Sequence, residues 1–459
     1  MVPMNVVLLS TYELGRQPFG LASPAAWLRR VGAEVSCFDL SREQLRPDEV
    51  GRADLMAVYL PMHTATRLAT RLVPRLKALN PTAKLCFYGL YAPMNEQYLR
   101  RLGADAVLGG EFEQGLADLA QSLDDGRESA APAISLGRQQ FLIPDRTLLP
   151  PLERYAKLNL PAGESRTVGY TEASRGCKHL CRHCPIVPVY NGTFRIVQQQ
   201  VVLEDIRRQV AAGAEHITFG DPDFFNGPRH AIELVEALHR EFPGITYDVT
   251  IKVEHLLKQA WHLATLRRTG CLFVTSAVES FDNHVLERLD KGHTREDLFQ
   301  VVELFRQADL TLAPTFVPFT PWTSLASFQQ FLATLVDLDL VAQVAPIQLA
   351  IRLLIPAGSR LLELAEVSQA VGPFDAEALY YPWQNADPRI DRLCDEIRRA
   401  VTAGERRHQT RGEIFEQVWE LAFGAPPVGK RWSSGAAVPH VEEPWYCCAE
   451  PTEEQFAVL

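Results

Sequence analysis

Three cysteines within eight positions constrain this chain more than any other stretch of its sequence. Cys177, Cys181 and Cys184 are spaced C-x3-C-x2-C. Thiolates at this spacing can hold three irons of a cubane cluster and leave the fourth iron open to bind and reduce another molecule. A closed zinc site is the alternative, because zinc also takes Cys3His ligand sets and both His179 and His183 lie inside the loop. The spacing alone leaves both interpretations open.

Size and composition limit the number of domains, the location and the partners that this chain can have. A chain of 459 residues is too long for one ordinary core and predicts roughly two to three domains. No stretch reaches the ~20 apolar residues that a bilayer span needs, and the first residues lack the basic segment of a secretion signal, so we expect a cytoplasmic protein with no membrane partner. The net charge of -10 argues against a nucleic-acid partner. Nine cysteines without such a signal predict metal ligands, core residues or reactive thiols rather than disulfides.

The first 125 residues alternate between short apolar strands and helical segments. This alternation predicts a doubly wound parallel α/β sheet of the Rossmann type. The strand patterns fall at 4–9, 34–39, 55–61, 84–88 and 104–108. Residues 126–165 are rich in Asp, Ser, Ala, Gly and Pro, which is typical of a surface linker.

Residues 166–365 repeat a strand-then-helix pattern and predict a partial (β/α)6 barrel. Its six strands are expected at 168–173, 215–220, 245–252, 271–277, 311–318 and 346–354. Residues 366–459 leave this pattern. There we expect a helical extension with helices at 388–402 and 411–423, followed by a Gly/Ser/Pro-rich tail that carries Cys447 and Cys448.

Uncommon residues follow the barrel strands one after another. Because chemistry in parallel barrels gathers at the carboxyl ends of the strands, we expect these residues on one rim. Besides the three cysteines they are Gly220, Asp221, Asp223, Lys252, Glu279 and Ser280. Taken singly, these residues also have ordinary explanations: a strand-to-helix turn, an exposed lysine at a strand end, and an acid at a helix N-terminus.

The cysteine run, preceded by Thr171-Glu-Ala-Ser-Arg-Gly, resembles the CxxxCxxC signature of radical SAM enzymes, and the barrel pattern is similar to their core. That resemblance implies a 4Fe-4S cluster on the three cysteines, S-adenosylmethionine (SAM) as a cosubstrate, and an electron donor such as flavodoxin or ferredoxin. It also implies contacts to SAM: the 220–223 loop to the methionyl amine, Lys252 to the carboxylate, and Glu279 with Ser280 to the ribose or amine.

The N-terminal pattern is similar to the cobalamin-binding-like domain that precedes the barrel in many radical SAM enzymes. The similarity includes the Gly110-Glu-Phe-Glu113 motif, which stands just before the last helix of the domain. Two features argue against bound cobalamin. Tyr88-Gly89-Leu90-Tyr91 stands where that family usually has a pair of glycines, and no Asp-x-His-x-x-Gly run supplies an axial histidine. An empty or repurposed domain is therefore the expectation.

The end of the chain, Pro444-Trp-Tyr-Cys447-Cys448-Ala-Glu-Pro451, closely resembles the CUAEP/CCAEP-tail radical SAM (seleno)protein family. Some members of that family carry selenocysteine at the position of Cys447, which points to a soft nucleophile or a ligand for a soft metalloid. Resemblance to its members in arsinothricin biosynthesis implies that arsenite is the substrate. It implies transfer of the 3-amino-3-carboxypropyl group of SAM to trivalent arsenic, with Cys447 and Cys448 holding the arsenic.

Two other functions stay open. A cobalamin-dependent radical SAM methyltransferase or C–C bond-forming enzyme would use the N-terminal domain as its resemblance suggests. A non-catalytic protein that binds metalloids or senses redox state would use the same thiols without turnover. The sequence also does not choose between release of an aminocarboxypropyl radical and of a 5′-deoxyadenosyl radical, because both use the same three cysteines.

Overall fold

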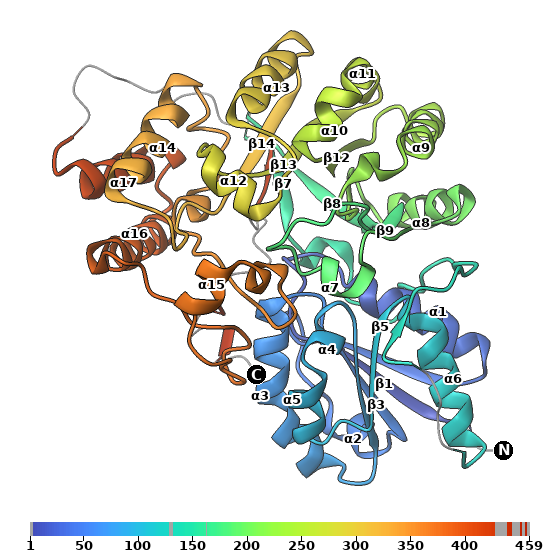
Figure 1. Cartoon of the computed structure of the whole chain (residues 1–459). Coiled ribbons are helices and arrows are strands. Elements are labelled where there is room, and N and C mark those ends of the chain that lie inside the picture. Colours follow the sequence, from blue (N-terminus) through green and yellow to red (C-terminus); the bar gives the residue numbers. More distant parts are fainter. Residues whose placement is uncertain are drawn as a thin grey trace.

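The computed structural model describes residues 3–127, 132–161, 163–426, 438–442, 450–451 and 455–456. Two β-sheets with flanking helices lie side by side, and a helical layer from the end of the chain packs against the second of them (Figure 1). The described residues contain no helix that is both long and apolar enough to cross a membrane. Cys447 and Cys448 lie outside the described residues.

The N-terminal sheet is parallel, with the described strands in the order β2-β1-β3-β4-β5-β6. These strands are β1 (Asn5–Ser10), β2 (Glu34–Asp39), β3 (Leu55–Tyr59), β4 (Lys84–Tyr88), β5 (Ala106–Gly110) and β6 (Ile134–Ser135). The helices are α1 (Phe19–Arg30), α2 (Pro47–Gly51), α3 (His63–Leu79), α4 (Tyr91–Met94), α5 (Glu96–Arg101) and α6 (Phe112–Asp124). Alternate residues of β1 enter two different apolar cores, one on each face of the sheet. The predicted doubly wound sheet is confirmed.

The second sheet has the strand order β14-β13-β12-β11-β8-β7-β15 within the described residues. Its strands are β7 (Lys157–Asn159), β8 (Ser165–Thr171), β11 (His216–Phe219), β12 (Thr246–Thr250), β13 (Cys271–Glu279), β14 (Thr311–Phe316) and β15 (His440–Val441). The run from β8 to β14 is parallel, whereas β7 and β15 pair antiparallel at one edge. This curled sheet is the predicted partial barrel, and its helices cover the outer face (Figure 1).

The remaining elements are short or lie around this sheet. A hairpin of β9 (Ser174–Gly176) and β10 (Phe194–Ile196) follows β8. The helices of the barrel are α7 (Val187–Tyr190), α8 (Gln199–Ala211), α9 (Pro228–Glu241), α10 (Val253–Lys258), α11 (Leu263–Arg268), α12 (Asn283–Leu289), α13 (Arg295–Gln307) and α14 (Leu325–Asp337). The C-terminal layer consists of α15 (Ala365–Ala370), α16 (Pro388–Arg406) and α17 (Arg411–Phe423), so the two helices predicted there are confirmed.

The sixth predicted barrel strand, 346–354, is wrong. The chain there forms the 3-10 turn η4 (Pro346–Leu349), and only Arg352 bridges Phe319. Pro346 stands at the start of the turn, where its fixed φ and missing N–H suit a turn better than an interior strand. The Oε1 atom of Gln348 accepts the backbone N–H of Phe316 at 3.0 Å, so a side chain satisfies the end of β14 where a sixth strand was expected.

The segment expected to be a linker also joins both sheets, through β6 in one and β7 in the other. The side chain of Arg146 fixes the middle of this segment. The Nε atom of Arg146 lies 2.7 Å from Asp205 Oδ1, its Nη2 donates to the carbonyl of Tyr170 at 2.6 Å, and its Nη1 donates to Gln17 Oε1 at 2.8 Å. Gln17 belongs to the N-terminal domain and the other two partners to the barrel. One guanidinium therefore connects the two domains.

Replacing Arg146 by Met should lower the free energy of unfolding by about 3–5 kcal/mol, because it leaves the buried carboxylate of Asp205 without its cation. Urea denaturation followed by fluorescence measures this change. The control is Arg127→Met, since the side chain of Arg127 is 70% exposed; it should change stability by less than about 0.5 kcal/mol. Equal effects of the two substitutions would show that Arg146 has no such role.

Candidate functional site

The three cysteines lie on a loop at the carboxyl edge of the barrel sheet, between β9 and α7. Cys181 is buried, and Cys177 and Cys184 are partly buried. Gly176, directly before the loop, has a φ of +71°, and a Cβ atom there would lie 2.3 Å from the ring of Tyr190. The loop is tied to the end of α12 by the backbone N–H of Arg182, which donates to the carbonyl of Leu289 at 2.9 Å. The fold thus presents three thiols on a braced loop.

The two histidines of the loop are engaged by side chains from other strand ends. His179 Nδ1 lies 3.2 Å from Lys252 Nζ, and its Nε2 lies 3.4 Å from Asp223 Oδ2. His183 Nε2 lies 3.1 Å from Glu279 Oε1. Within the described residues, only one set of metal-ligating atoms converges within 4.8 Å, from Cys177, His179 and Asp223. A cubane cluster would instead use the three thiols, which all lie on the same loop.

Glu279 ends β13 and faces the cysteine loop. A register shift between Ala277 and Glu279 and a φ of +71° at Glu279 turn its carboxylate away from the regular sheet pattern. Lys291 Nζ lies 3.2 Å from Glu279 Oε1. Burial disfavours the charge, but Lys291 and His183 outweigh it and hold the pKa of Glu279 at about 2. Glu279 and Ser280 line a cavity of about 280 Å³ between the ends of β13 and β14.

Lys252 is 9% exposed, so the alternative of an exposed lysine at a strand end is wrong. It caps the start of α10 and lies 3.3 Å from Glu254 as well as beside His179. The predicted rim lysine and Glu279 are therefore both on the side of the barrel that holds the cysteine loop. A negatively charged group entering there would meet the ammonium of Lys252.

The two aspartates after β11 are already used inside the protein. Asp221 accepts hydrogen bonds from the backbone N–H of Ala173 at 2.9 Å and from Ser174 Oγ at 2.5 Å, and burial raises its pKa to about 7. Asp223 accepts from the backbone N–H of Phe225 and pairs with His255 at 2.6 Å. These carboxylates brace the rim.

Gly220, at the same strand end, has no space for a side chain, because a Cβ atom would lie 1.8 Å from the hydroxyl of Tyr170. Close approach of the Tyr170 ring therefore requires glycine at this position. With both aspartates engaged, the 220–223 loop presents its backbone to the rim.

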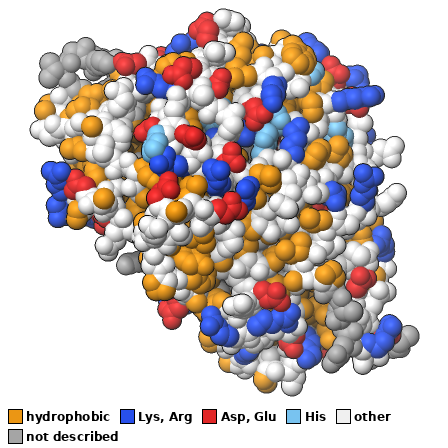
Figure 2. All heavy atoms as spheres, in the orientation of Figure 1, with side chains coloured by type: hydrophobic (Ala, Val, Ile, Leu, Met, Phe, Trp, Pro, Cys, Tyr) orange, Lys and Arg blue, Asp and Glu red, His pale blue; other side chains and the backbone are white. Residues whose placement is uncertain are grey.

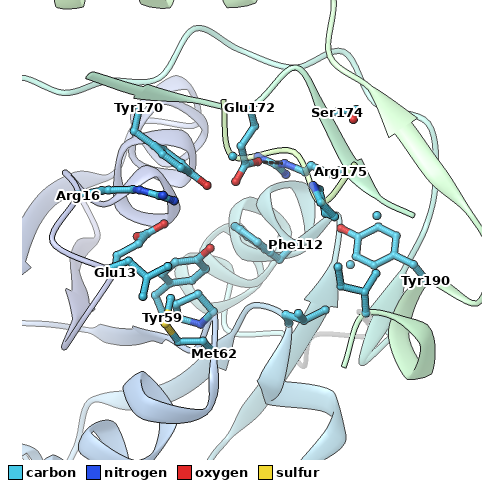
Figure 3. A pocket seen from close by; sticks show the side chains of 18 residues that line it. Glu13, Arg16, Tyr59, Met62, Phe112, Tyr170, Glu172, Ser174, Arg175 and Tyr190 are labelled. Carbon is cyan, nitrogen blue, oxygen red and sulfur yellow. Dashed lines mark hydrogen bonds and ion pairs between the residues drawn. The ribbon is translucent and has the colours of Figure 1, made fainter. Parts of the chain in front are cut away.

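An ion-pair cluster joins the two domains directly beside the cysteine loop. Arg175, two residues before Cys177, lies 3.4 Å from Glu111, 2.6 Å from Glu113 and 2.7 Å from Glu172. The Arg175 side chain is only 7% exposed. Figure 3 shows it paired with Glu172 at the wall of a cavity. Glu111 and Glu113 belong to the Gly-Glu-x-Glu motif before the last helix of the N-terminal domain. This motif therefore binds a β9 residue that stands two positions before Cys177 in the barrel.

A cavity of about 190 Å³ lies against this cluster, between the strand ends of both domains (Figure 3). Aromatic side chains and two further charged residues line it: Tyr59, Phe112, Tyr170, Tyr190, Glu13 and Arg16. Sequence reasoning missed Arg175, Glu13 and Arg16. The Glu172-x-x-Arg175 spacing was visible, but nothing in the sequence brings it to Glu111.

Comparison with known proteins identifies the barrel. Residues 171–323 match the sequence model of the radical SAM superfamily. The chain therefore carries a radical SAM domain and is an enzyme of that class, and this domain implies a 4Fe-4S cluster and SAM. The match covers a third of the chain, so the tail family inferred from Cys447-Cys448 stays a prediction.

The chain is similar to hopanoid C-3 methylase of Methylococcus capsulatus, with 26% identity over 333 residues, covering 67% of this chain and 62% of that protein. Among solved structures it is similar to the cobalamin-dependent SAM radical enzyme OxsB, with a TM-score of 0.64 and 14% identity over 88% of this chain and 67% of the other. It is also similar to the radical SAM methyltransferase TsrM of Kitasatospora setae, with a TM-score of 0.62 and 17% identity over 80% and 77%. These structures confirm the predicted fold class.

The expectation of a domain without cobalamin is not supported by these similarities, because OxsB is a cobalamin-dependent enzyme. Aromatic side chains pack at the strand ends of the N-terminal domain. The rings of Tyr59, Tyr88 and Phe112 pack together with centroids 5.1–5.8 Å apart, at the ends of β3 and β4 and the start of α6. A Cβ atom on Gly20 would lie 2.1 Å from the Tyr59 ring, so this packing is tight. The interdomain cavity is also smaller than the roughly 300–1,000 Å³ of ordinary ligand sites.

Replacing any one of Cys177, Cys181 and Cys184 by serine should abolish assembly of the 4Fe-4S cluster, since each thiolate holds one iron. Iron and sulfide analysis with visible absorption after anaerobic reconstitution measures the loss. Cys394→Ala is the matched control: Cys394 is buried on α16, outside the cysteine loop, with its Sγ 3.8 Å from the carbonyl of Ala350, and its loss should leave the cluster intact. Full iron content in a loop variant would contradict the assignment.

Burial raises the pKa of Glu111 to about 7, although Arg175 opposes this shift. An unfolded glutamate has a pKa of about 4.3, so the folded state binds the proton more tightly and stability falls as the pH rises from about 4.3 through 7. Glu111→Gln removes this titration. Between pH 5 and pH 8 the variant should lose less stability than the wild type, by a difference of the order of 2–3 kcal/mol.

Urea denaturation at several pH values tests this expectation. Glu34→Gln is the control, since Glu34 is exposed on β2, and its stability should follow the wild-type pH dependence. Parallel curves for wild type and Glu111→Gln would contradict the raised pKa.

Proposed function

We propose that this radical SAM enzyme cleaves SAM reductively and transfers the 3-amino-3-carboxypropyl group to trivalent arsenic, supplied as arsenite. The bond between the sulfonium sulfur and the aminocarboxypropyl carbon breaks and a C–As bond forms, with methylthioadenosine as the coproduct. One hydroxyl of arsenite leaves as water, so that arsenic stays trivalent and the step consumes two electrons and one proton. A donor such as flavodoxin or ferredoxin supplies the electrons. The observation that carries the proposal is the three-cysteine loop at the barrel rim, in a chain whose tail contains the pair Cys447-Cys448.

The contact that holds the described end of the tail supports the proposed function. Glu450, two residues after Cys448, pairs with His63 at 2.9 Å and with Arg67 at 3.1 Å, both on α3. The side chain of His63 is fully buried, so this is a built contact. Met62, directly before His63, lines the cavity between the domains. The described end of the tail therefore binds beside the mouth of that cavity.

The residues of the rim have distinct roles in this proposal. Cys177, Cys181 and Cys184 would hold the cluster, which when bound supplies an electron to the sulfonium of SAM. Lys252, buried and positive, pairs with the carboxylate of SAM. Glu279 stays ionised at neutral pH, because its pKa is about 2, and accepts hydrogen bonds from the ribose or the amine, with Ser280 beside it. Gly220, Asp221 and Asp223 act through the backbone of their loop, since both carboxylates are engaged.

The role of Cys447 and Cys448 rests on the chemistry of arsenic. Trivalent arsenic is a soft centre that prefers thiolates to oxygen or nitrogen ligands. Two adjacent thiols can hold it while one position stays open for the new carbon. Some related tails carry selenocysteine at the position of Cys447. A thiol with a purely structural role would gain little from that replacement of sulfur by selenium. These two residues are the proposed catalytic residues at the acceptor.

A cobalamin-dependent radical SAM methyltransferase is the second candidate. Its support is the similarity to OxsB, described as cobalamin-dependent, and to the methyltransferase TsrM. That similarity argues for bound cobalamin, whereas the sequence pattern at Tyr88–Tyr91 argued against it. Against it stands the packing of Tyr59, Tyr88 and Phe112, so no step of the proposed reaction uses a corrin. A purely metalloid-binding protein is no longer a candidate, because the radical SAM domain makes this chain an enzyme.

The reduced, cluster-loaded protein should convert SAM and arsenite to methylthioadenosine and an aminocarboxypropyl arsenical, detected by liquid chromatography with mass spectrometry. Cys447→Ser with Cys448→Ser should keep the cluster and lower arsenical formation at least ~10-fold, since oxygen holds arsenic poorly. Cys394→Ala is the control that removes a thiol far from the rim and should retain activity.

Formation of 5′-deoxyadenosine without methylthioadenosine would exclude aminocarboxypropyl transfer. Undiminished turnover in the double serine variant would remove the tail from the mechanism. Stoichiometric cobalamin in protein purified from cobalamin-supplied cells, together with methyl transfer, would select the second candidate.

A further inference from the structure

The cavity between the domains is lined by two charged side chains that each bury a polar atom without a hydrogen-bond partner. Glu13 is 6% exposed, and its Oε2 atom has no hydrogen-bond partner. The Nε atom of Arg16 is also buried without a partner, and the Arg16 guanidinium stacks over the ring of Tyr170 at 5.1 Å. Both side chains line the same cavity and face its interior (Figure 3). A buried carboxylate oxygen and a buried guanidinium nitrogen without hydrogen bonds are costly unless something else pairs with them.

The loop that carries these two residues is held in an uncommon conformation. Between Glu13 and Arg16, Leu14 has a φ of +51° and Gly15 a φ of +68°. Leucine rarely adopts the left-handed region, and such backbone strain persists only where the surroundings enforce it. The consequence is that both charged side chains leave the end of β1 toward the barrel and not toward solvent.

The neighbouring charges do not neutralise this pair. Arg175 is already shared by Glu111, Glu113 and Glu172, so it has no free capacity for Glu13. The other buried arginine nearby, Arg146, is bound to Asp205 and Gln17. Burial, together with the charges of Glu172 and Asp39, raises the pKa of Glu13 well above its usual range, although Arg16 and Arg146 oppose this shift.

The walls of the cavity select for size. Tyr59, Phe112, Tyr170 and Tyr190 bring aromatic faces and edges around the charged groups. Aromatic faces favour an ammonium group over a neutral one. With a volume of about 190 Å³, the cavity has room for a small metabolite.

We propose that this cavity binds a small zwitterionic α-amino acid, with its ammonium group on Glu13 and its carboxylate on Arg16. Such a ligand satisfies both unpartnered groups at once and adds no net charge to a buried site. Arg175 and Gly176 also line the cavity and lead directly into Cys177, so the bound amino acid lies next to the cysteine loop. The site goes beyond the proposed reaction, because it does not depend on which group SAM donates.

Calorimetric titration of the full-length, cluster-loaded protein with L-homoserine, in the absence of SAM, tests the site. Two analogues serve as matched probes: 3-amino-1-propanol keeps only the ammonium, and 4-hydroxybutanoate keeps only the carboxylate. L-Homoserine should bind saturably, and each analogue at least ~10-fold more weakly, because each leaves one buried charge unpaired. Since SAM is absent, the outcome is independent of whether the enzyme cleaves SAM as proposed above.

Variants locate the binding. Glu13→Gln and Arg16→Met should each weaken L-homoserine binding at least ~10-fold, and Arg16→Lys should restore part of it by keeping the positive charge. Glu34→Gln, at an exposed glutamate, should bind like the wild type. Circular dichroism and iron content check that each variant is folded; if Glu13→Gln fails this check, the two Arg16 variants decide.

Three outcomes would overturn the proposal. They are the absence of saturable binding at millimolar L-homoserine, equal binding of the single-charge analogues, and binding that the Arg16 variants leave unchanged. Stoichiometric uptake of cobalamin that displaces bound L-homoserine would support a corrin site at this position instead.

Discussion

One buried guanidinium holds the functional parts of this protein together. Arg175 stands between the N-terminal domain and the barrel, bound by Glu111 and Glu113 on one side and by Glu172 on the other. Such a cluster is stable only when every charge is paired, because an unpaired buried ion costs several kcal/mol. Arg175 also lies on β9, two residues before Cys177. The position of the three thiols is therefore coupled to the docking of the two domains, and the cavity beside them exists only where both domains meet.

The rim of the barrel uses its charged residues in two different ways. Asp221 and Asp223 are consumed by internal hydrogen bonds and hold the strand ends in place. Lys252 and Glu279, by contrast, are fixed by neighbouring charges and histidines yet keep their charge beside the cysteine loop. A charged substrate such as SAM needs this division, since a rim that reorganised on binding would lose part of the binding energy.

The N-terminal domain has the topology of a cofactor-binding domain with an interior occupied by its own side chains. Strand order and the closing Gly110-Glu-Phe-Glu113 motif agree with the expected class, while Tyr59, Tyr88 and Phe112 fill the region between the strand ends. The remaining small, charged cavity fits the interpretation that the domain is used for another purpose.

Acidic and basic side chains are interspersed over the face of the molecule that Figure 2 shows.

Local patterns were enough to predict the alternation of strands and helices, the cysteine loop and the helices at 388–402 and 411–423, because periodicity, caps and ligand spacing are short-range properties. The sixth barrel strand failed because Pro346 and the side chain of Gln348 favour a turn that periodicity does not reveal. Only the tertiary structure brought Glu111 to Arg175 and Glu13 to the rim of the barrel. Those pairings join residues about 60 and 160 positions apart, and their energy comes from excluding water between two domains, which no local pattern encodes.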